Sequence, residues 1–164
     1  MAKNLVLKLE VEPIPSQNWG VSLAHLLPKE VWDSLRREVY SIADYTCLVC
    51  GATDKRLHCH EVWVYNDKRR VQKLSKLDCE CRDCHAVRHW GRTVLVSQSD
   101  PTELERLIAH FCKVNNCTRE VFESHRDKVN RAVKRRSKYK YKVNFGVFKT
   151  EEVTRIWRNS RGQE

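Results

Sequence analysis

Two Cys-x-x-Cys pairs are the strongest chemical signal in this sequence, Cys47-Leu-Val-Cys50 and Cys81-Arg-Asp-Cys84. Each pair forms a tight knuckle that offers two thiolates, and two knuckles brought together supply the four sulfur ligands of a tetrahedral zinc site. Gly51 directly follows the first pair, and glycine tolerates the positive φ that the turn of a knuckle requires. We therefore predict a structural Zn²⁺ held by Cys47, Cys50, Cys81 and Cys84.

The other cysteines leave alternatives open. Cys79 stands two residues before Cys81 and is an alternative third ligand, although the spacing of Cys81 to Cys84 favours that pair. A thioredoxin-like redox pair is the other common role of Cys-x-x-Cys, but two separate pairs without a βαβ pattern disfavour it. Cys112 and Cys117 are expected to be inert thiols. Disulfides are not expected, because charge interrupts the N-terminal residues too early for a secretory signal and we expect a cytoplasmic protein.

The segment between and after the cysteine pairs predicts a strand, a second strand and a short helix. Residues 56–65 are rich in β-branched and aromatic side chains, which favours a strand that turns at residues 66–67 and returns along residues 71–77. A helix is expected to start near Arg82 and to end at Gly91, a residue that suits a helix C-terminus.

Three histidines fall on these elements. His85 and His89 are four residues apart, so one helix face would carry both imidazoles, and they could share a cation. The strand would place His60 opposite them, and alternation along the strand puts His58 on the same side as His60. The alternative to a catalytic role is that these histidines fill a second, closed zinc site.

The order of these motifs resembles that of the HNH endonucleases, whose ββα-metal fold holds a single catalytic cation. The likeness is greatest to the bacterial branch with a Cys-His-Glu-Val-Trp central strand, here residues 59–63, and a Cys-His-x-Val-x-His-x-Gly helix, here residues 84–91. It extends through residues 113–115 and 135–137. The resemblance implies an α+β fold in which a zinc-stapled ββα-metal module (45–92) lies between an N-terminal segment with a helix (1–44) and a helical, basic C-terminal region (93–164).

The resemblance also implies roles for individual residues. His60 is expected to be the general base, and His85 and His89 to hold the catalytic cation. Cys59, which stands where many family members have an Asp or His ligand, is a third candidate ligand of the catalytic cation. Residues 75–77 (Ser-Lys-Leu) stand where the family's central Asn falls. These two differences leave the cation open among Mg²⁺, Mn²⁺, Ni²⁺ and Zn²⁺. The expected activity is hydrolysis of DNA phosphodiester bonds, by nicking or double-strand cleavage, with RNA not excluded as a substrate.

Charge favours the same kind of partner. The chain has 164 residues, and 31 Lys and Arg against 21 Asp and Glu give a net charge of +10, which suits a polyanion. Residues 138–143 alternate basic with aromatic or β-branched residues and predict a half-buried strand. A solvated basic face is the simpler explanation of the charge. The candidate nucleic-acid-binding residues are Arg131, Lys134, Arg135, Arg136, Lys138, Lys140 and Lys142.

The flanking regions are expected to support the module. Leu5, Leu7 and Leu9 alternate as in a strand, and residues 29–43 carry an apolar stripe at helical spacing. Asp100 is a candidate N-cap with Pro101 at the first helical position and Glu103 completing a capping box, and residues 115–116 are expected to end that helix. Another helix is expected to start after Thr118.

Two further functions stay open. A zinc-ribbon-like nucleic-acid-binding protein without catalysis would tolerate loss of His60, whereas a nuclease would lose turnover and keep its DNA affinity. A protein-interaction module would bind DNA weakly even at low salt. No apolar run in the sequence is long enough to span a bilayer, and the oligomeric state is not determined by the sequence.

Overall fold

The centre of the protein is a long antiparallel hairpin. The computed structural model describes residues 6–97 and 100–149. Strands β1 (Leu57–Asn66) and β2 (Val71–Cys81) pair from Leu57 opposite Cys81 to Asn66 opposite Val71, with an irregularity between Val62 and Trp63. A short strand β3 (Lys142–Asn144) runs parallel to the start of β2, which gives the sheet order β1-β2-β3. The predicted hairpin is confirmed: β1 has the expected length and is shifted by one residue, and β2 is longer than expected because it continues to Cys81.

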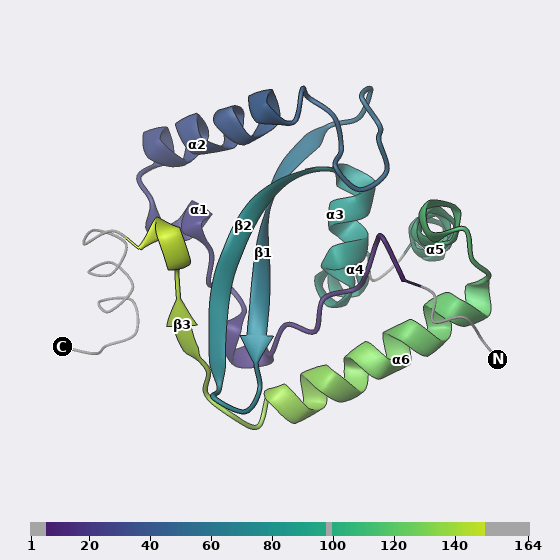
Figure 1. Ribbon diagram of the computed structural model, residues 1–164. Helices are drawn as coiled ribbons and strands as arrows, with labels where there is room; N and C mark the ends of the chain where they lie inside the picture. The colour runs from purple at the N-terminus through teal and green to yellow at the C-terminus, as the bar shows by residue number, and fades with distance from the viewer. Residues whose placement is uncertain (1–5, 98–99, 150–164) are drawn as a thin grey trace.

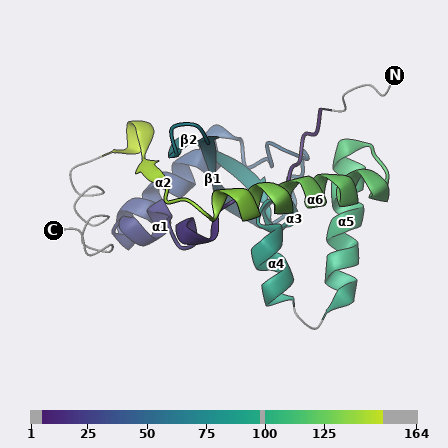
Figure 2. The ribbon, with the colours of Figure 1, turned by 90° about the horizontal axis from the view of Figure 1, so that it is seen from below.

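Helices cover both faces of this hairpin, so the fold is α+β as predicted (Figure 1). The described helices are α1 (Leu23–Leu26), α2 (Lys29–Ile42), α3 (Arg82–Arg88), α4 (Trp90–Val96), α5 (Pro101–Asn115) and α6 (Arg119–Arg136), with 3₁₀ turns at Ser16–Asn18 and Gly146–Phe148. α1 and α2 contact one face, and α3 contacts the other. Figure 2 shows α4 and α5 extending away from the hairpin on the same side, with α6 passing in front of α3 and the upper end of α5.

Each face has its own hydrophobic core. The larger core joins α3, α5 and α6 with the N-terminal segment and includes Leu9, Val87, Phe111 and Phe122. The smaller core lies under α1 and α2, where Leu23 and Leu26 pack on Leu74 and Phe145. Because strand side chains alternate between faces, the hairpin separates these two cores.

The N-terminal strand prediction is wrong for the residues that the structure describes. Leu5 lies outside the described residues, and residues 6–15 form no strand. The backbone there bonds to a side chain instead: Asn115 Oδ1 accepts hydrogen bonds from the N–H groups of Lys8 (2.8 Å) and Leu9 (3.0 Å), and Asn115 Nδ2 donates to the Leu9 carbonyl (2.9 Å). Leu9 is fully buried, so the apolar side chains pack on helices rather than on a sheet.

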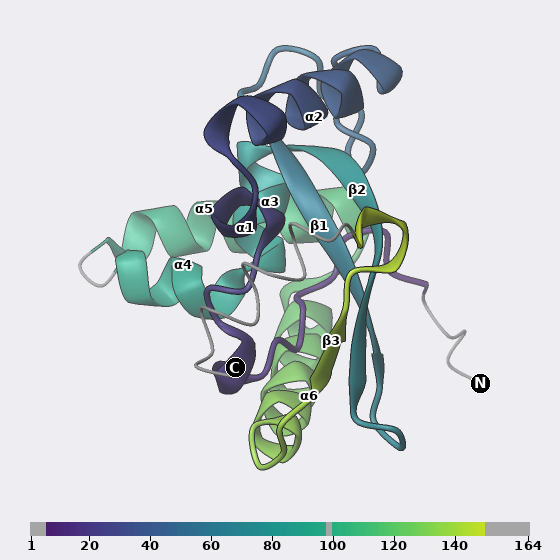
Figure 3. The same ribbon diagram turned by 90° about the vertical axis from the view of Figure 1, so that its left-hand side faces the viewer.

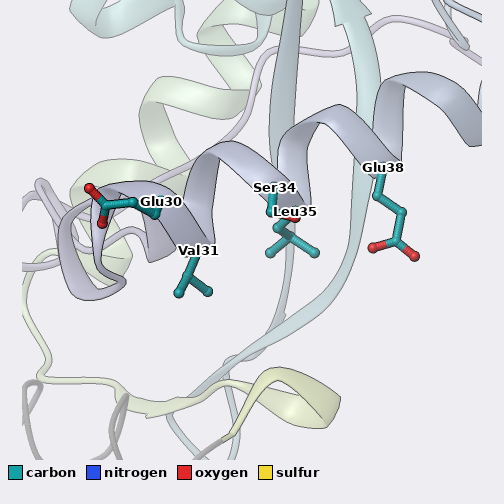
Figure 4. A pocket seen from close by; sticks show the side chains of 5 residues that line it. All are labelled: Glu30, Val31, Ser34, Leu35 and Glu38. Carbon is teal, nitrogen blue, oxygen red and sulfur yellow. The ribbon is translucent and has the colours of Figure 1, made fainter.

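α2 buries less of its stripe than predicted. Trp32 and Leu35 pack on the smaller core, but Val31 is 48% and Ile42 is 79% exposed. The physical reason is the narrow surface that a two-stranded ribbon offers to a helix of this length. A shallow hollow of about 470 Å³ runs along the uncovered side of α2 (Figure 4). It is lined by Glu30, Val31, Ser34, Leu35 and Glu38.

The cap of α5 is confirmed in part. The Asp100 carboxylate accepts hydrogen bonds from the N–H groups of Thr102 and Glu103, and Pro101 is the first helical residue. The Glu103 carboxylate does not complete a capping box, because it binds Arg106 and Arg82. The helix ends at Asn115 as predicted, followed by Asn116 in the left-handed region at φ 48°.

Two other boundaries differ from the predictions. Gly91 does not end the helix that starts at Arg82; α3 ends at Arg88, and Gly91 lies in the first turn of α4. The predicted strand over residues 138–143 is mostly a turn, because the N–H groups of Lys138 and Tyr139 bond to the last carbonyls of α6. Pairing therefore begins only at Lys142, whose N–H donates to the Arg70 carbonyl.

Candidate metal centres

The four predicted cysteines converge at the base of the hairpin. The ligand sulfurs of Cys47, Cys50, Cys81 and Cys84 all lie within 4.8 Å of one another, a group that we call the cysteine centre. Gly51 has φ +76° and its N–H bonds to the Cys47 carbonyl, which closes the first knuckle as expected. The second knuckle forms where β2 passes into α3, with the Cys84 N–H donating to Cys81 Sγ (3.5 Å).

The thiols of the cysteine centre shift one another's pKa values. Hydrogen bonds from Cys81 and Cys84 lower the pKa of Cys47, while hydrogen bonds with Cys47 and Cys81, followed by burial, raise the pKa of Cys84. One thiolate among donor thiols is the arrangement that a thiophilic dication completes by displacing the remaining protons. His110 Nε2 lies 3.2 Å from Cys84 Sγ, which adds a contact from α5 that the sequence analysis did not foresee.

The three predicted histidines form a second group on the α3 face, the histidine centre. One nitrogen each from His60, His85 and His89 lies within 4.8 Å of the others. The ring centroids are 5.4 Å apart for His60 and His85, 5.1 Å for His60 and His89, and 4.6 Å for His85 and His89. β1 supplies the first histidine, while α3 and its C-cap supply the other two, so the predicted juxtaposition is confirmed.

His58 joins the edge of this group, as the alternation along β1 predicts. Its ring stacks on His85 with centroids 4.8 Å apart and an interplanar angle of 18°. Its Nε2 is buried without a hydrogen-bond partner among the described residues, and so is Nδ1 of His60. Two bare imidazole nitrogens at one place are costly unless something occupies them, which is what a cation site provides.

The candidate ligand Cys59 is not brought to the histidine centre, which among the described residues consists of His60, His85 and His89. It pairs with Cys79 across the hairpin, and strand alternation turns both thiols to the opposite face, under α2. Burial, together with the nearby Glu61 carboxylate, raises the pKa of Cys59 to about 12, so it stays a neutral thiol. Cys79 likewise lies outside the cysteine centre, whose described ligands are the four predicted thiols.

Glu12 is the site residue that the sequence analysis missed. Its Oε1 lies 2.8 Å from His60 Nε2, and its backbone N–H donates to the Arg88 carbonyl (2.9 Å). A carboxylate accepts hydrogen bonds only, so neutral His60 carries its proton on Nε2 and leaves Nδ1 able to accept one. No spacing in the sequence signals this contact, because the N-terminal segment reaches the site through its own packing on α5.

A buried ion pair also influences the pKa of His60. Arg88 Nε donates to Glu80 Oε1 at 2.9 Å, and the Glu80 side chain is fully buried. Burial lowers the pKa of His60, but the hydrogen bond and charge of Glu12 and the charge of Glu80 outweigh it, so the pKa of His60 lies above its ordinary value. This buried carboxylate and Glu12 thus make His60 a stronger base.

The pKa values of His85 and His89 are shifted in the opposite direction to that of His60. Burial, followed by the charge of the neighbouring histidines, lowers the pKa of His85 to about 2; burial and the charge of His60 lower that of His89 to about 4. Both imidazoles are therefore neutral at pH 7, and neutral imidazole is the form that ligates metals. The donor set of the histidine centre fits a first-row divalent cation.

The candidate nucleic-acid-binding residues separate into two kinds. Arg136 is a packing residue: its side chain is 13% exposed, lies 4.3 Å from the centroid of the Tyr65 ring and donates to Asp67 and the Pro13 carbonyl. The others are exposed: Arg131, Lys134, Arg135, Lys138, Lys140 and Lys142. Of these, Arg135 alone pairs with a carboxylate of the described residues, that of Asp67 at 3.2 Å.

No protein-family model, curated protein or solved structure matches this chain. Across residues 6–97 and 100–149, every helix is too short or too polar to cross a bilayer. The cysteine centre and the histidine centre are therefore the features of this chain that bear on its function.

Proposed function

We propose that this protein is a metal-dependent endonuclease that hydrolyses DNA phosphodiester bonds. The observation that carries the proposal is the histidine centre: His60, His85 and His89 converge on the helix face of a strand–strand–helix unit, beside a separate four-sulfur centre. This arrangement agrees with what the resemblance to the HNH endonucleases implies. The cysteine centre holds a structural Zn²⁺ that fixes the end of the hairpin to α3.

In this proposal the residues of the histidine centre have different roles in hydrolysis. His85 and His89 hold the catalytic cation, which supplies positive charge for the scissile phosphate and the leaving oxygen. His60 takes the proton of the attacking water on Nδ1, the nitrogen left bare by the bond from Nε2 to Glu12. Glu12 is a positioning residue that fixes the tautomer and orientation of His60.

Positive charge around the histidine centre supports a phosphate substrate. After burial, the charges of Arg56, Arg82 and Arg92 are the causes that lower the pKa of His58, and all three arginines are exposed. The Arg82 N–H also donates to the Arg56 carbonyl (2.9 Å), so these two basic residues lie side by side at the base of the hairpin. A field of this sign draws a polyanion toward the histidines.

The test is cleavage of supercoiled plasmid by the wild type, His60→Ala and the control His25→Ala, each with Mg²⁺, Mn²⁺, Ni²⁺ or Zn²⁺. His25 is exposed on α1 and lies outside the histidine centre. We expect the wild type and the control to nick plasmid with at least one cation, and His60→Ala to lose about 10²–10⁴-fold in rate, the usual contribution of a general base. Equal nicking by all three proteins would contradict the role of His60.

A second function is favoured by one specific observation, the burial of His60, which is 1% exposed. Such a histidine also suits a closed, non-catalytic zinc site in a zinc-ribbon-like nucleic-acid-binding protein. In that case none of the proteins would cut plasmid with any cation, all would bind DNA, and His60→Ala would lose bound zinc. The plasmid assay with parallel metal analysis separates the two functions.

A further inference from the structure

We infer that the tip of the β1–β2 hairpin and the end of α6 form one preorganised surface that binds the phosphate backbone of duplex DNA at a distance from the histidine centre. This inference rests on the proposed function and adds a substrate footprint to it. The tip surface consists of Lys68, Arg69, Arg70, Lys134, Arg135, Lys138, Lys140 and Lys142, all of them exposed.

Specific contacts join the two segments. Asp67, in the turn between β1 and β2, accepts hydrogen bonds from Arg136 Nε (2.8 Å), from the Arg135 guanidinium (3.2 Å) and from the Tyr141 hydroxyl (3.0 Å). One carboxylate thus ties the hairpin turn to the end of α6 and to the segment that leads into β3. The Asp67 carboxylate therefore fixes the positions of neighbouring basic residues of the tip surface while neutralising few of them.

Contacts on the other side of the turn close the same junction. The Arg70 guanidinium lies 4.1 Å from the centroid of the Tyr139 ring, and the Arg70 carbonyl accepts the N–H of Lys142 (2.8 Å). Figure 3 shows the hairpin tip and the end of α6 at the same end of the molecule, with the segment that leads into β3 between them. Residues far apart in the sequence therefore present their charges together.

Part of the charge of the tip surface has no carboxylate partner among the described residues. Within the described part of the chain, Lys68, Arg69 and Lys134 have no ion pair with a carboxylate, and their side chains are exposed. Clustered like charges repel one another and are costly to keep together without a counter-charge. Phosphates are the matching ligand, since they are bound through charge without any reading of base sequence.

The distance from the histidine centre to the tip surface determines which phosphates of the DNA the tip surface contacts. From His60 to the end of β1 at Asn66 the strand spans roughly 20 Å at about 3.3 Å per residue. With DNA lying along the hairpin at about 3.4 Å per base pair, the tip meets phosphates roughly six base pairs from the cut. Arg56 and Arg82 mark the opposite end of this path, beside the histidine centre.

The test compares two double variants that remove equal charge. Lys68→Ala with Arg69→Ala changes the tip, and Arg37→Ala with Lys113→Ala changes exposed residues on α2 and α5. Binding of fluorescent duplex DNA is measured in EDTA over a salt series. We expect the tip variant to bind at least about tenfold more weakly near 0.1 M salt, with a salt slope lower by about 2, and the control to bind within about twofold of the wild type.

The outcomes separate this inference from the proposed activity. Equal losses in the two double variants would overturn the tip surface and show an effect of net charge alone, whatever the plasmid assay gives. Weak binding by the tip variant alone would support the surface, even with a wild type that nicks no plasmid. Tight binding by both double variants, together with nicking by the wild type, would overturn the surface and leave the nuclease standing.

Discussion

The cysteine centre and the histidine centre are built in different ways from the same hairpin and helix. The cysteine centre takes its ligands from two local knuckles, and its four sulfurs face one another. The histidine centre takes one histidine from a strand and two from a helix and its C-cap, and a carboxylate of the N-terminal segment is hydrogen-bonded to the first of them. A closed set of thiolates suits a structural cation, and nitrogens with bare lone pairs suit a site that must exchange ligands.

Under the proposed function, this difference separates a centre that stabilises the fold from a centre that carries out the reaction. The cysteine centre lies within the larger core, where Cys47, Cys81 and Cys84 pack with Val87 and Phe111. The histidine centre lies along the hairpin under the N-terminal segment, close to exposed arginines. Substitutions in the cysteine centre should therefore change the fold, whereas substitutions in the histidine centre should change activity alone.

The largest expected effect is at the cysteine centre. Cys84→Ser should lose the bound zinc and the cooperative thermal transition, because structural zinc sites contribute about 10–16 kcal/mol of apparent binding free energy to folding. Metal analysis and thermal circular dichroism measure the two effects. Cys117→Ser is the matched control, since Cys117 lies outside the cysteine centre. A Cys84→Ser protein with full zinc content and an unchanged transition would break the comparison.

The next largest effect is at the histidine centre. His85→Ala should lose about a hundredfold or more of the plasmid-nicking rate, because the cation loses a ligand, while the thermal transition stays. His110→Ala gives the contrast: its Nε2 contacts Cys84, so that variant should hold zinc more weakly and keep its nicking rate once zinc is saturating. Loss of fold in His85→Ala would mean that both centres are structural.

A smaller effect is expected at Glu12. Glu12→Gln keeps a hydrogen-bond acceptor near His60 but removes the charge that makes the imidazole basic, so nicking should fall roughly 10–100-fold. DNA affinity in EDTA and the thermal midpoint should match those of the wild type. Glu10→Gln, an exposed carboxylate on the same segment, should leave all three measurements unchanged. Equal nicking by the two variants would remove Glu12 from the site.

The smallest effect is expected at Cys59. Because this thiol faces α2 rather than the histidines, Cys59→Ser should leave the metal content and the nicking rate unchanged and cost about 1 kcal/mol of stability, typical of a partly buried substitution. Metal analysis, plasmid nicking and denaturant unfolding measure these quantities. A loss of the second cation in this variant would restore Cys59 as a ligand.

Sequence spacing predicted which cysteines and histidines come together, but tertiary packing decided which other residues contact them. The spacing of the Cys-x-x-Cys pairs and the four-residue step from His85 to His89 are local rules, and both groups came together as expected. Strand alternation predicted that His58 lies beside the centre. The same alternation turns Cys59 away from it, although the resemblance had made Cys59 a candidate ligand. The contact of Glu12 with His60 had no such signal, since it depends on how an irregular segment packs.

The errors in the fold have the same origin. The alternating leucines near the N-terminus favour a strand, but Asn115 takes up the backbone groups that would have paired in a sheet. Arg136 looked like a free cation within a basic run, yet Tyr65 and Asp67 hold it in the structure. Single-sequence patterns describe one element at a time, and these contacts join elements more than sixty residues apart.

The most direct test of the division between the two centres is a cation titration of protein that carries a single equivalent of zinc, with plasmid nicking and the thermal transition followed together. We expect a folded protein that does not nick at one equivalent, and nicking that rises and saturates as a second cation is added, without a change in the transition. Full nicking with one zinc, unaffected by further cation, would contradict this division of roles, as would a transition that appears only with the second cation.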